Sequence, residues 1–212
     1  MTDPKEFILT TTAPQFPPLV PEIRLNLASE IVPLWRKTEE ELAAEGAPPP
    51  YWAFAWAGGQ ALARYILDTG LALPRVLDFG SGSGLVAIAA AKAGAGHVLA
   101  ADIDPFAAAA IAFNAAQNGV LIHVTQDDVI GQDGGWQAIL IGDMCYERPL
   151  AERLMAWLTA RVRGGAMVLI GDPGRTYFPK IGVEKLATYN VPTTRELEDR
   201  DMRETGVYRL GV

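Results

Sequence analysis

The stretch VLDFGSGSGLVAIAAAKAG, residues 76–94, combines three local patterns that together predict the fold. An apolar run ends at Asp78 and Phe79, three glycines follow at positions 80, 82 and 84, and an alanine-rich segment comes next. Such patterns are typical of a strand, a tight turn and a helix in succession. Because a glycine-rich turn lets a ligand approach the backbone closely, the stretch also predicts a binding site.

Strands and helices alternate along the chain after this stretch, which favours an α/β domain with a mostly parallel sheet. Two strands close together in sequence at the end of the chain are expected to form an antiparallel hairpin. A strand around Ile23–Leu27 and short helices over 38–46 and 57–69 are expected before the alternating region. The expected later strands are 75–79, 97–101, 121–125, 136–141, 166–170, 193–198 and 206–212, and the later helices are 84–93, 105–118 and 147–162.

The first part of the chain differs in composition from the rest. Residues 1–21 are rich in threonine and proline, so we expect an extended N-terminal arm there. Residues 22–212 contain no internal repeat and no linker, and the length suits one domain with a full core. We therefore expect a single domain over 22–212.

Composition excludes several classes of protein. The net charge of −7 argues against a nucleic-acid partner and leaves a cationic ligand or a basic protein surface. Cys145 is the single cysteine, so there is no disulfide framework, and one cysteine with two histidines offers no metal-ligand spacing. The N-terminal residues resemble neither a signal peptide nor a membrane span. We expect a cytoplasmic protein, for which a monomer is the working assumption.

Three ligand hypotheses compete for the glycine turn. Residues 82–87 match the relaxed G-x-G-x-x-A dinucleotide fingerprint, and Asp102 lies about 20 residues further on, as that fingerprint requires. The turn contains no Lys or Arg, however, and a pyrophosphate would be repelled by the carboxylates that follow the strands. These carboxylates are Asp78, Asp102, Asp127, Asp128 and Asp143.

The second hypothesis is a cationic nucleoside. S-adenosylmethionine carries a sulfonium and an ammonium, has no phosphate, and offers hydroxyl and amino donors to carboxylates. The third hypothesis treats the aspartates as helix caps and turn residues, which we favour for Asp104 because Pro105 follows it. For Asp78 and Asp102 we favour ligand contact, and of Asp127 and Asp128 we prefer Asp127.

Four segments resemble a known family. LDFGSGSG (77–84) and AADIDP (100–105) are similar to motifs of the class I methyltransferases that use S-adenosylmethionine. PPPYWAFAWAGGQALARYIL (48–67) and GDMCYE (142–147) resemble the electron-transfer-flavoprotein β-subunit lysine methyltransferases, whose group carries an Asp-x-x-Tyr after the fourth strand. The resemblance covers roughly residues 20–212. Cys145 and Glu147 depart from the family pattern, but Asp143 and Tyr146 are intact.

The resemblance implies a Rossmann-like, seven-stranded, mostly parallel sheet with helices on both faces and a C-terminal antiparallel hairpin. It also implies S-adenosylmethionine as cofactor and the electron transfer flavoprotein β subunit as protein partner. Asp143 and Tyr146 would border the target lysine, with Asp143 orienting the amine. The implied cofactor-binding residues are Asp78, Gly80 and Gly82 for the methionine part, Asp102 for the ribose, Ile103 and Asp127 for the adenine, and Trp56 and Gln60 closing the methionine side.

Other functions stay open at this point. A different methylated protein such as a ribosomal protein, an NAD(P)-linked oxidoreductase and a non-catalytic cofactor-binding module are the alternatives. The intact Asp143 and Tyr146 speak against a non-catalytic module. The loop GDPGRTYFP (171–179) is expected at the same edge of the sheet, with Asp172 and Arg175 toward the protein substrate.

Overall fold

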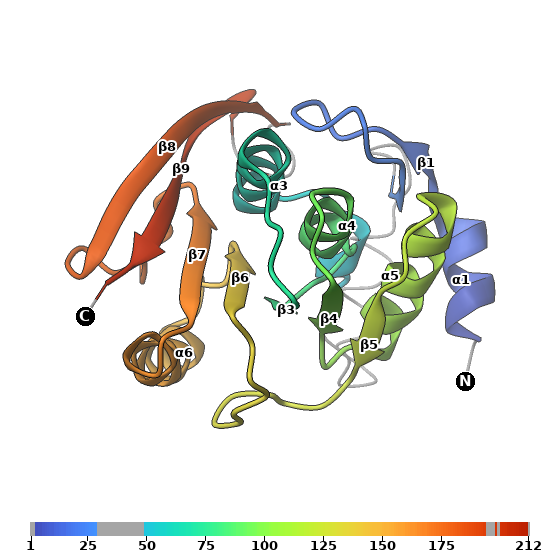
Figure 1. Ribbon diagram of the computed structural model, residues 1–212. Coiled ribbons are helices and arrows are strands. Elements are labelled where there is room, and N and C mark those ends of the chain that lie inside the picture. The colour runs from blue at the N-terminus through green and yellow to red at the C-terminus, as the bar shows by residue number, and fades with distance from the viewer. Residues whose placement is uncertain (1–2, 29–48, 194–197, 199, 212) are drawn as a thin grey trace.

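A computed structural model describes residues 3–28, 49–193, 198 and 200–211 of the chain. Its main element is a seven-stranded sheet of order β5-β4-β3-β6-β7-β9-β8 (Figure 1). Strands β3 to β7 run parallel, and β9 and β8 follow in antiparallel pairing. This confirms the expected fold class. The strands are β3 (Arg75–Phe79), β4 (His97–Ala101), β5 (His123–Thr125), β6 (Ala138–Gly142), β7 (Met167–Asp172), β8 (Val183–Pro192) and β9 (Met202–Leu210).

Helices cover both faces of the sheet, as expected. Alternate residues of a strand point to opposite faces, so one apolar strand contributes to two cores. Leu140 of β6 packs with α3 and α4, whereas its neighbours Ile139 and Ile141 pack with α6 on the other face. Figure 1 shows α6 on the side of the sheet away from α3 and α4. The helices are α3 (Ala57–Thr69), α4 (Leu85–Lys92), α5 (Pro105–Gln117) and α6 (Arg148–Arg163).

The N-terminal segment differs from the extended arm expected over 1–21. Residues Pro4–Thr11 form helix α1, and β1 (Ala13–Gln15) pairs with β2 (Leu25–Leu27) in a separate two-stranded sheet. The Asp3 side chain caps α1 by accepting from the backbone N–H of Lys5, and Ile8 is buried in a cluster with residues of α5. Asp3 and Pro4 thus form the same Asp-Pro helix start that predicts α5. The proline-rich composition of residues 1–21 favoured an extended arm instead.

The C-terminal hairpin is present, but its first strand lies earlier than expected. The strand that pairs with β9 is β8, not a strand over 193–198, of which residues 194–197 lie outside the described part. A register shift between Lys185 and Ala187 interrupts the alternation of β8, which is why its pattern is weak in the sequence. The helix expected over 38–46 also lies outside the described residues.

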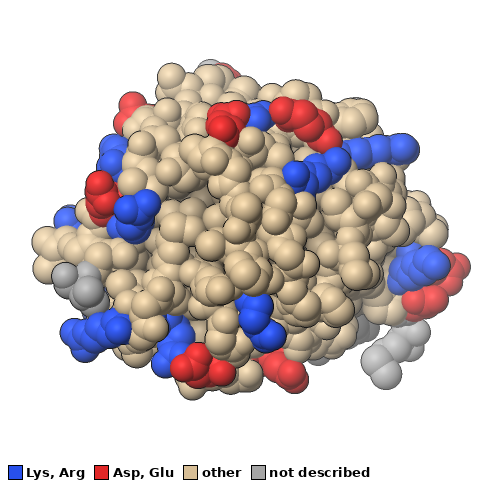
Figure 2. All heavy atoms as spheres, in the orientation of Figure 1, with Lys and Arg blue, Asp and Glu red and all other residues tan. Residues whose placement is uncertain are grey.

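The surface carries mixed charge. On the face shown in Figure 2, Lys and Arg lie scattered among Asp and Glu without forming a continuous basic stripe. Within the described residues, no helix is both long enough and apolar enough to cross a bilayer.

The order of the strands determines where a ligand can bind. From β3 the chain passes to β4 and β5 on one side, and later returns to place β6 on the other side of β3. In open α/β sheets, ligands bind outside the carboxyl ends of the strands at such a reversal. The carboxyl ends of β3, β4 and β6 are therefore where the fold predicts the site.

Candidate active site

A cavity of about 670 Å³ lies at these carboxyl ends. Its walls come from the turn after β3, the segments after β4, β5 and β6, and the residues that precede α3. Eight of the ten residues expected from the sequence line it: Trp56, Gly80, Gly82, Asp102, Ile103, Asp127, Asp143 and Tyr146. Asp78 and Gln60 are absent from its lining.

The glycine turn after β3 has the conformation that its glycines predict. Gly80 and Gly82 have positive φ values of 63° and 54°, which L side chains rarely adopt. Asp78 is buried beneath the turn, where its carboxylate accepts from the Ser81 hydroxyl at 2.5 Å and the Ala87 N–H at 2.9 Å. Burial raises the pKa of Asp78 to about 7, against the lowering effect of these two bonds. Asp78 thus shapes the turn from below.

Asp102 joins the end of β4 to the glycine turn. Its Oδ2 accepts from the Gly82 N–H at 2.8 Å and its Oδ1 from the Asp104 N–H at 3.1 Å. Asp104 in turn caps α5 through the Phe106 N–H at 2.8 Å, as expected. Ile103 is 72% exposed although it lines the cavity, so its apolar side chain is available to a flat ligand surface.

Asp127 and Asp128 both line the cavity but differ in their partners. Asp128 forms an ion pair with Arg153 of α6, which lowers the pKa of the Asp128 carboxyl. Asp127 accepts a hydrogen bond from the Thr125 hydroxyl at 2.9 Å. Asp128 is thus paired with a cation, and the contact of Asp127 with a ligand stays a prediction.

Asp143 follows β6 and caps a helix that comes from a distant part of the sequence. The first turn of α3 has backbone N–H groups without helical partners. The side chain of its N-cap residue, Trp56, accepts no hydrogen bond from them. Asp143 Oδ2 accepts from the N–H groups of Gly58 and, at 3.2 Å, Gly59. The residue has a φ of 58°, a rare value outside glycine that is concentrated at functional sites.

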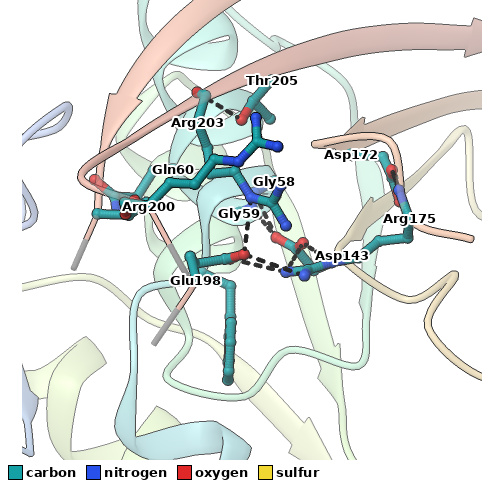
Figure 3. A network of polar contacts seen from close by, with 12 residues as sticks. Gly58, Gly59, Gln60, Asp143, Asp172, Arg175, Glu198, Arg200, Arg203 and Thr205 are labelled. Carbon is teal, nitrogen blue, oxygen red and sulfur yellow. Dashed lines mark hydrogen bonds and ion pairs between the residues drawn. The ribbon is translucent and has the colours of Figure 1, made fainter. Parts of the chain in front are cut away.

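The other oxygen of Asp143 is held by Arg175, as Figure 3 shows. Arg175 Nε and Nη2 donate to Asp143 Oδ1 at 2.9 and 2.7 Å, and the same guanidinium donates to both oxygens of Glu198 at 2.8 and 3.1 Å. Arg175 therefore turns inward to the cavity. Asp172, the other loop residue expected to meet a protein substrate, is fully buried and accepts from the N–H groups of Gly174 and Arg175 at 2.7 Å.

Asp143 is a buried carboxylate with a pKa near neutrality. Burial raises the pKa of Asp143 to about 6, the Arg175 guanidinium lowers it, and the Glu198 and Asp172 carboxylates raise it. The side chain is 7% exposed, on the cavity side. The charge of Asp143 therefore depends on the groups packed around it.

Aromatic rings form the rim of the cavity near Asp143. Tyr146 and Tyr51 lie with ring centroids 5.5 Å apart, and Trp56 lies 5.9 Å from Tyr51. Burial raises the pKa of Tyr146 to about 12, so its phenol stays protonated and can donate a hydrogen bond. Arg175 also lies over the Trp56 ring, with its Cζ 5.8 Å from the centroid. Trp56, Tyr51 and Tyr146 thus line the same cavity as Asp143.

Gln60 lies away from the cavity, behind the segment that precedes α3. Its Nε2 donates to the Ala55 carbonyl at 2.7 Å and its Oε1 accepts from the Leu19 N–H at 3.3 Å. Gln60 therefore connects the N-terminal segment at Leu19 to the segment that precedes α3 at Ala55.

Sequence reasoning missed two residues of the site. Tyr51 belongs to the same tryptophan-rich segment as Trp56, so that segment was a usable signal. Glu198 had no local signal, because its place beside Arg175 depends on how the end of the chain folds back.

The close approach of α3 to Asp143 leads to a stability prediction. A Cβ at Gly58 would collide with the Gly171 carbonyl and with Asp143 Oδ2, whereas a Cβ at Gly59 would meet Val86 Cγ2 at an ordinary 3.9 Å. We expect Gly58→Ala to lower the free energy of unfolding by about 1–3 kcal/mol, as overpacking does. The control Gly59→Ala should be neutral or stabilising by up to about 1 kcal/mol, because alanine favours a helix. Urea unfolding of both variants measures this, and equal effects would contradict the packing.

Known proteins that this chain resembles are methyltransferases. Residues 60–139 match the family model of ribosomal protein L11 methyltransferase. The chain is 40% identical over 216 residues to the electron transfer flavoprotein beta subunit lysine methyltransferase of Xenopus laevis, covering 98% of this chain and 87% of that protein. The human protein of the same name is 35% identical over 210 residues, covering 90% and 75%.

A solved structure supports the fold. The magnesium protoporphyrin IX methyltransferase of Synechocystis with bound S-adenosylmethionine is 18% identical, with a TM-score of 0.52 over 73% of this chain and 78% of that one.

Proposed function

Because the chain belongs to the family of electron transfer flavoprotein β-subunit lysine methyltransferases, we propose that it methylates lysine side chains of that subunit with S-adenosylmethionine as the methyl donor. The chain is a methyltransferase by this membership. We propose in addition which residues hold the methyl donor, which residues hold the lysine, and which protein is methylated.

The observation that carries the proposal is the acidic cavity around the glycine turn. Asp102 and Asp127 offer carboxylate oxygens to ribose hydroxyls and to an adenine amino group, and Ile103 offers an apolar surface to the adenine ring. Gly80 and Gly82 leave room for the methionine part beside the backbone. S-adenosylmethionine fits this donor set, since it is cationic and carries no phosphate. When bound, it supplies a methyl group on a positively charged sulfur.

The reaction needs a neutral lysine amine aligned with the bond that breaks. The lysine ammonium first loses one proton to water. The nitrogen lone pair would then form a bond to the methyl carbon as the carbon–sulfur bond breaks with its electrons staying on sulfur, so that the products would be a methylated ammonium and S-adenosylhomocysteine with an uncharged thioether. Neutralising a lysine of ordinary pKa at pH 7 costs about 4.6 kcal/mol. The protein therefore contributes by positioning the amine and excluding water.

The aromatic rim and Asp143 are the proposed lysine site. Tyr146 and Tyr51 would flank the aliphatic part of the lysine side chain, and Asp143 would attract and orient its nitrogen. Both oxygens of Asp143 already accept protein hydrogen bonds, so the nitrogen would share Oδ1 with Arg175. This makes Asp143 an orienting group and not a free base.

The electron transfer flavoprotein is a better substrate hypothesis than ribosomal protein L11. The L11 methyltransferase model matches only residues 60–139, which contain the glycine turn and Asp102 but neither Asp143 nor Tyr146. The flavoprotein methyltransferases match along almost the whole chain. We also propose a cytoplasmic location, which the composition of the chain favours, and a monomer.

Labelling tests the choice of substrate. The enzyme is incubated with a cell extract and S-adenosylmethionine that carries a radioactive methyl group, and the labelled protein is identified by mass spectrometry. We expect the label on the electron transfer flavoprotein β subunit, in lysine. Label confined to L11 or to another ribosomal protein would replace the proposed substrate.

A further inference from the structure

The Arg175 guanidinium lines the cavity and connects Asp143, which also lines it, to Glu198, which is buried behind it. Arg175 lies between Asp143 and Glu198 and donates two hydrogen bonds to each (Figure 3). The Arg175 side chain is 19% exposed, the Asp143 side chain 7% and the Glu198 side chain 0%. Ion pairs this buried keep their strength, because little water or salt reaches them.

Several buried carboxylates lie close to Arg175, so the ionisation of Asp143 depends on this arginine. Asp143, Asp172 and Glu198 are three buried carboxylates, and a buried carboxylate stays ionised only when it is paired. Arg203 of β9 donates to Glu198, with its Nε 3.2 Å from Oε2. Arg175 is therefore the cation in direct contact with Asp143 among the described residues.

We propose that Arg175 is a positioning residue for methyl transfer: its two hydrogen bonds to Asp143 keep that carboxylate ionised and oriented toward the cavity. This inference rests on the proposed function, because it assigns Asp143 to the lysine. Arg175 acts through Asp143, so its effect should appear in the pH dependence of the reaction.

The two neighbours of Asp143 should act with opposite signs. Among the described residues, the charged groups that face Asp143 are Arg175 on the loop after β7, Asp172 at the end of β7, and Glu198. Helix α3 faces Asp143 with backbone N–H groups. Arg175 lowers the pKa of Asp143 and Glu198 raises it. Without the arginine charge, the pKa of Asp143 should be higher than in the wild type. Without the glutamate charge, it should be lower than in the wild type.

The experiment compares Arg175→Gln, Glu198→Gln and Arg175→Lys with the wild type. The rate of methylation of the purified electron transfer flavoprotein is measured from pH 5 to 9, and kcat and KM are separated. In Arg175→Gln we expect the acid side of the profile to move to higher pH by about 1–3 pH units. In Glu198→Gln it should move to lower pH. Arg175→Lys keeps the charge, so its acid side should stay near that of the wild type while kcat falls.

A second readout is independent of activity. The carboxyl carbon of Asp143 is titrated by NMR in the wild type, Arg175→Gln and Glu198→Gln, and its midpoint should move in the same two directions. The matched control is Arg64→Gln: Arg64 is also 19% exposed and also pairs with two carboxylates, Glu22 and Asp68, but lies outside the cavity lining. It should leave both the midpoint and the pH profile unchanged.

The outcomes separate this inference from the proposed function. If the wild type does not methylate the flavoprotein, the proposed function fails, and the inference fails with it as a statement about catalysis. If methylation occurs but the midpoint or the acid side does not move in Arg175→Gln, or moves the same way in Glu198→Gln, Arg175 is not the positioning residue. Should Arg175→Gln fail to fold, Glu198→Gln still gives a signed result that supports or overturns the inference.

Discussion

Asp143→Asn should lower the rate of lysine methylation by about 100-fold or more, while the affinity for S-adenosylhomocysteine stays within a few-fold of wild type. The asparagine keeps the size and one acceptor oxygen but loses the charge that attracts and orients the amine. Misplacing a reacting group by about 1 Å is enough for a loss of this size. Methylation kinetics and calorimetry with S-adenosylhomocysteine measure the two effects separately.

A stability control is needed because Asp143 also caps α3. The asparagine amide group cannot accept from all the donors that now meet the carboxylate, namely Gly58, Gly59 and Arg175. Loss of a cap costs about 0.5–2 kcal/mol, so the melting temperature should fall without loss of the fold at the assay temperature. Near-wild-type activity in Asp143→Asn would show that the charge is not required. Loss of cofactor binding would move Asp143 into the cofactor site.

Asp102→Ala should weaken the binding of S-adenosylhomocysteine by tenfold or much more. The proposed role of Asp102 is to accept from two ribose hydroxyls, and hydrogen bonds to a charged group contribute about 1.5–3 kcal/mol each. The substitution also removes the bond from the Gly82 N–H, which loosens the glycine turn that the ligand must touch. Isothermal titration calorimetry gives the affinity directly, and neither variant nor wild type should bind NAD or NADP measurably.

The matched control for this prediction is Asp104→Ala. Asp104 is the next carboxylate on the same segment and also lines the cavity, but its side chain caps α5. Its removal should reduce stability by about 1 kcal/mol and leave the affinity within a few-fold. Unchanged affinity in Asp102→Ala, or an equal loss in both variants, would show that the ribose carboxylate is wrongly assigned.

The sequence predicts the parts of this fold that depend on local pattern. Strands β3 and β6 are apolar runs and α5 begins with Asp-Pro, so their places follow from burial and capping. The same signal at α1 was hidden by a proline-rich neighbourhood, and β8 was missed because a register shift breaks its alternation. Local pattern is reliable where one physical effect dominates, and fails where two compete.

The candidate site was predictable in part for the same reason. Carboxylates that follow parallel strands meet at one edge of the sheet, which is why Asp102 and Asp143 could be expected together. The pairing of Asp143 with Arg175 joins residues 32 positions apart, and Glu198 comes from beyond the hairpin strand β8. Contacts between residues so far apart in the sequence depend on tertiary packing, so no local sequence pattern predicts them.

The proposed lysine methylation would change the mass of the electron transfer flavoprotein β subunit. The purified flavoprotein is incubated with the enzyme and S-adenosylmethionine, the intact mass of the β subunit is measured, and the modified peptide is sequenced. We expect a mass increase by whole methyl groups, located on lysine and absent with Asp143→Asn. An unmodified β subunit, with an enzyme that binds S-adenosylhomocysteine and methylates a different protein, would contradict it.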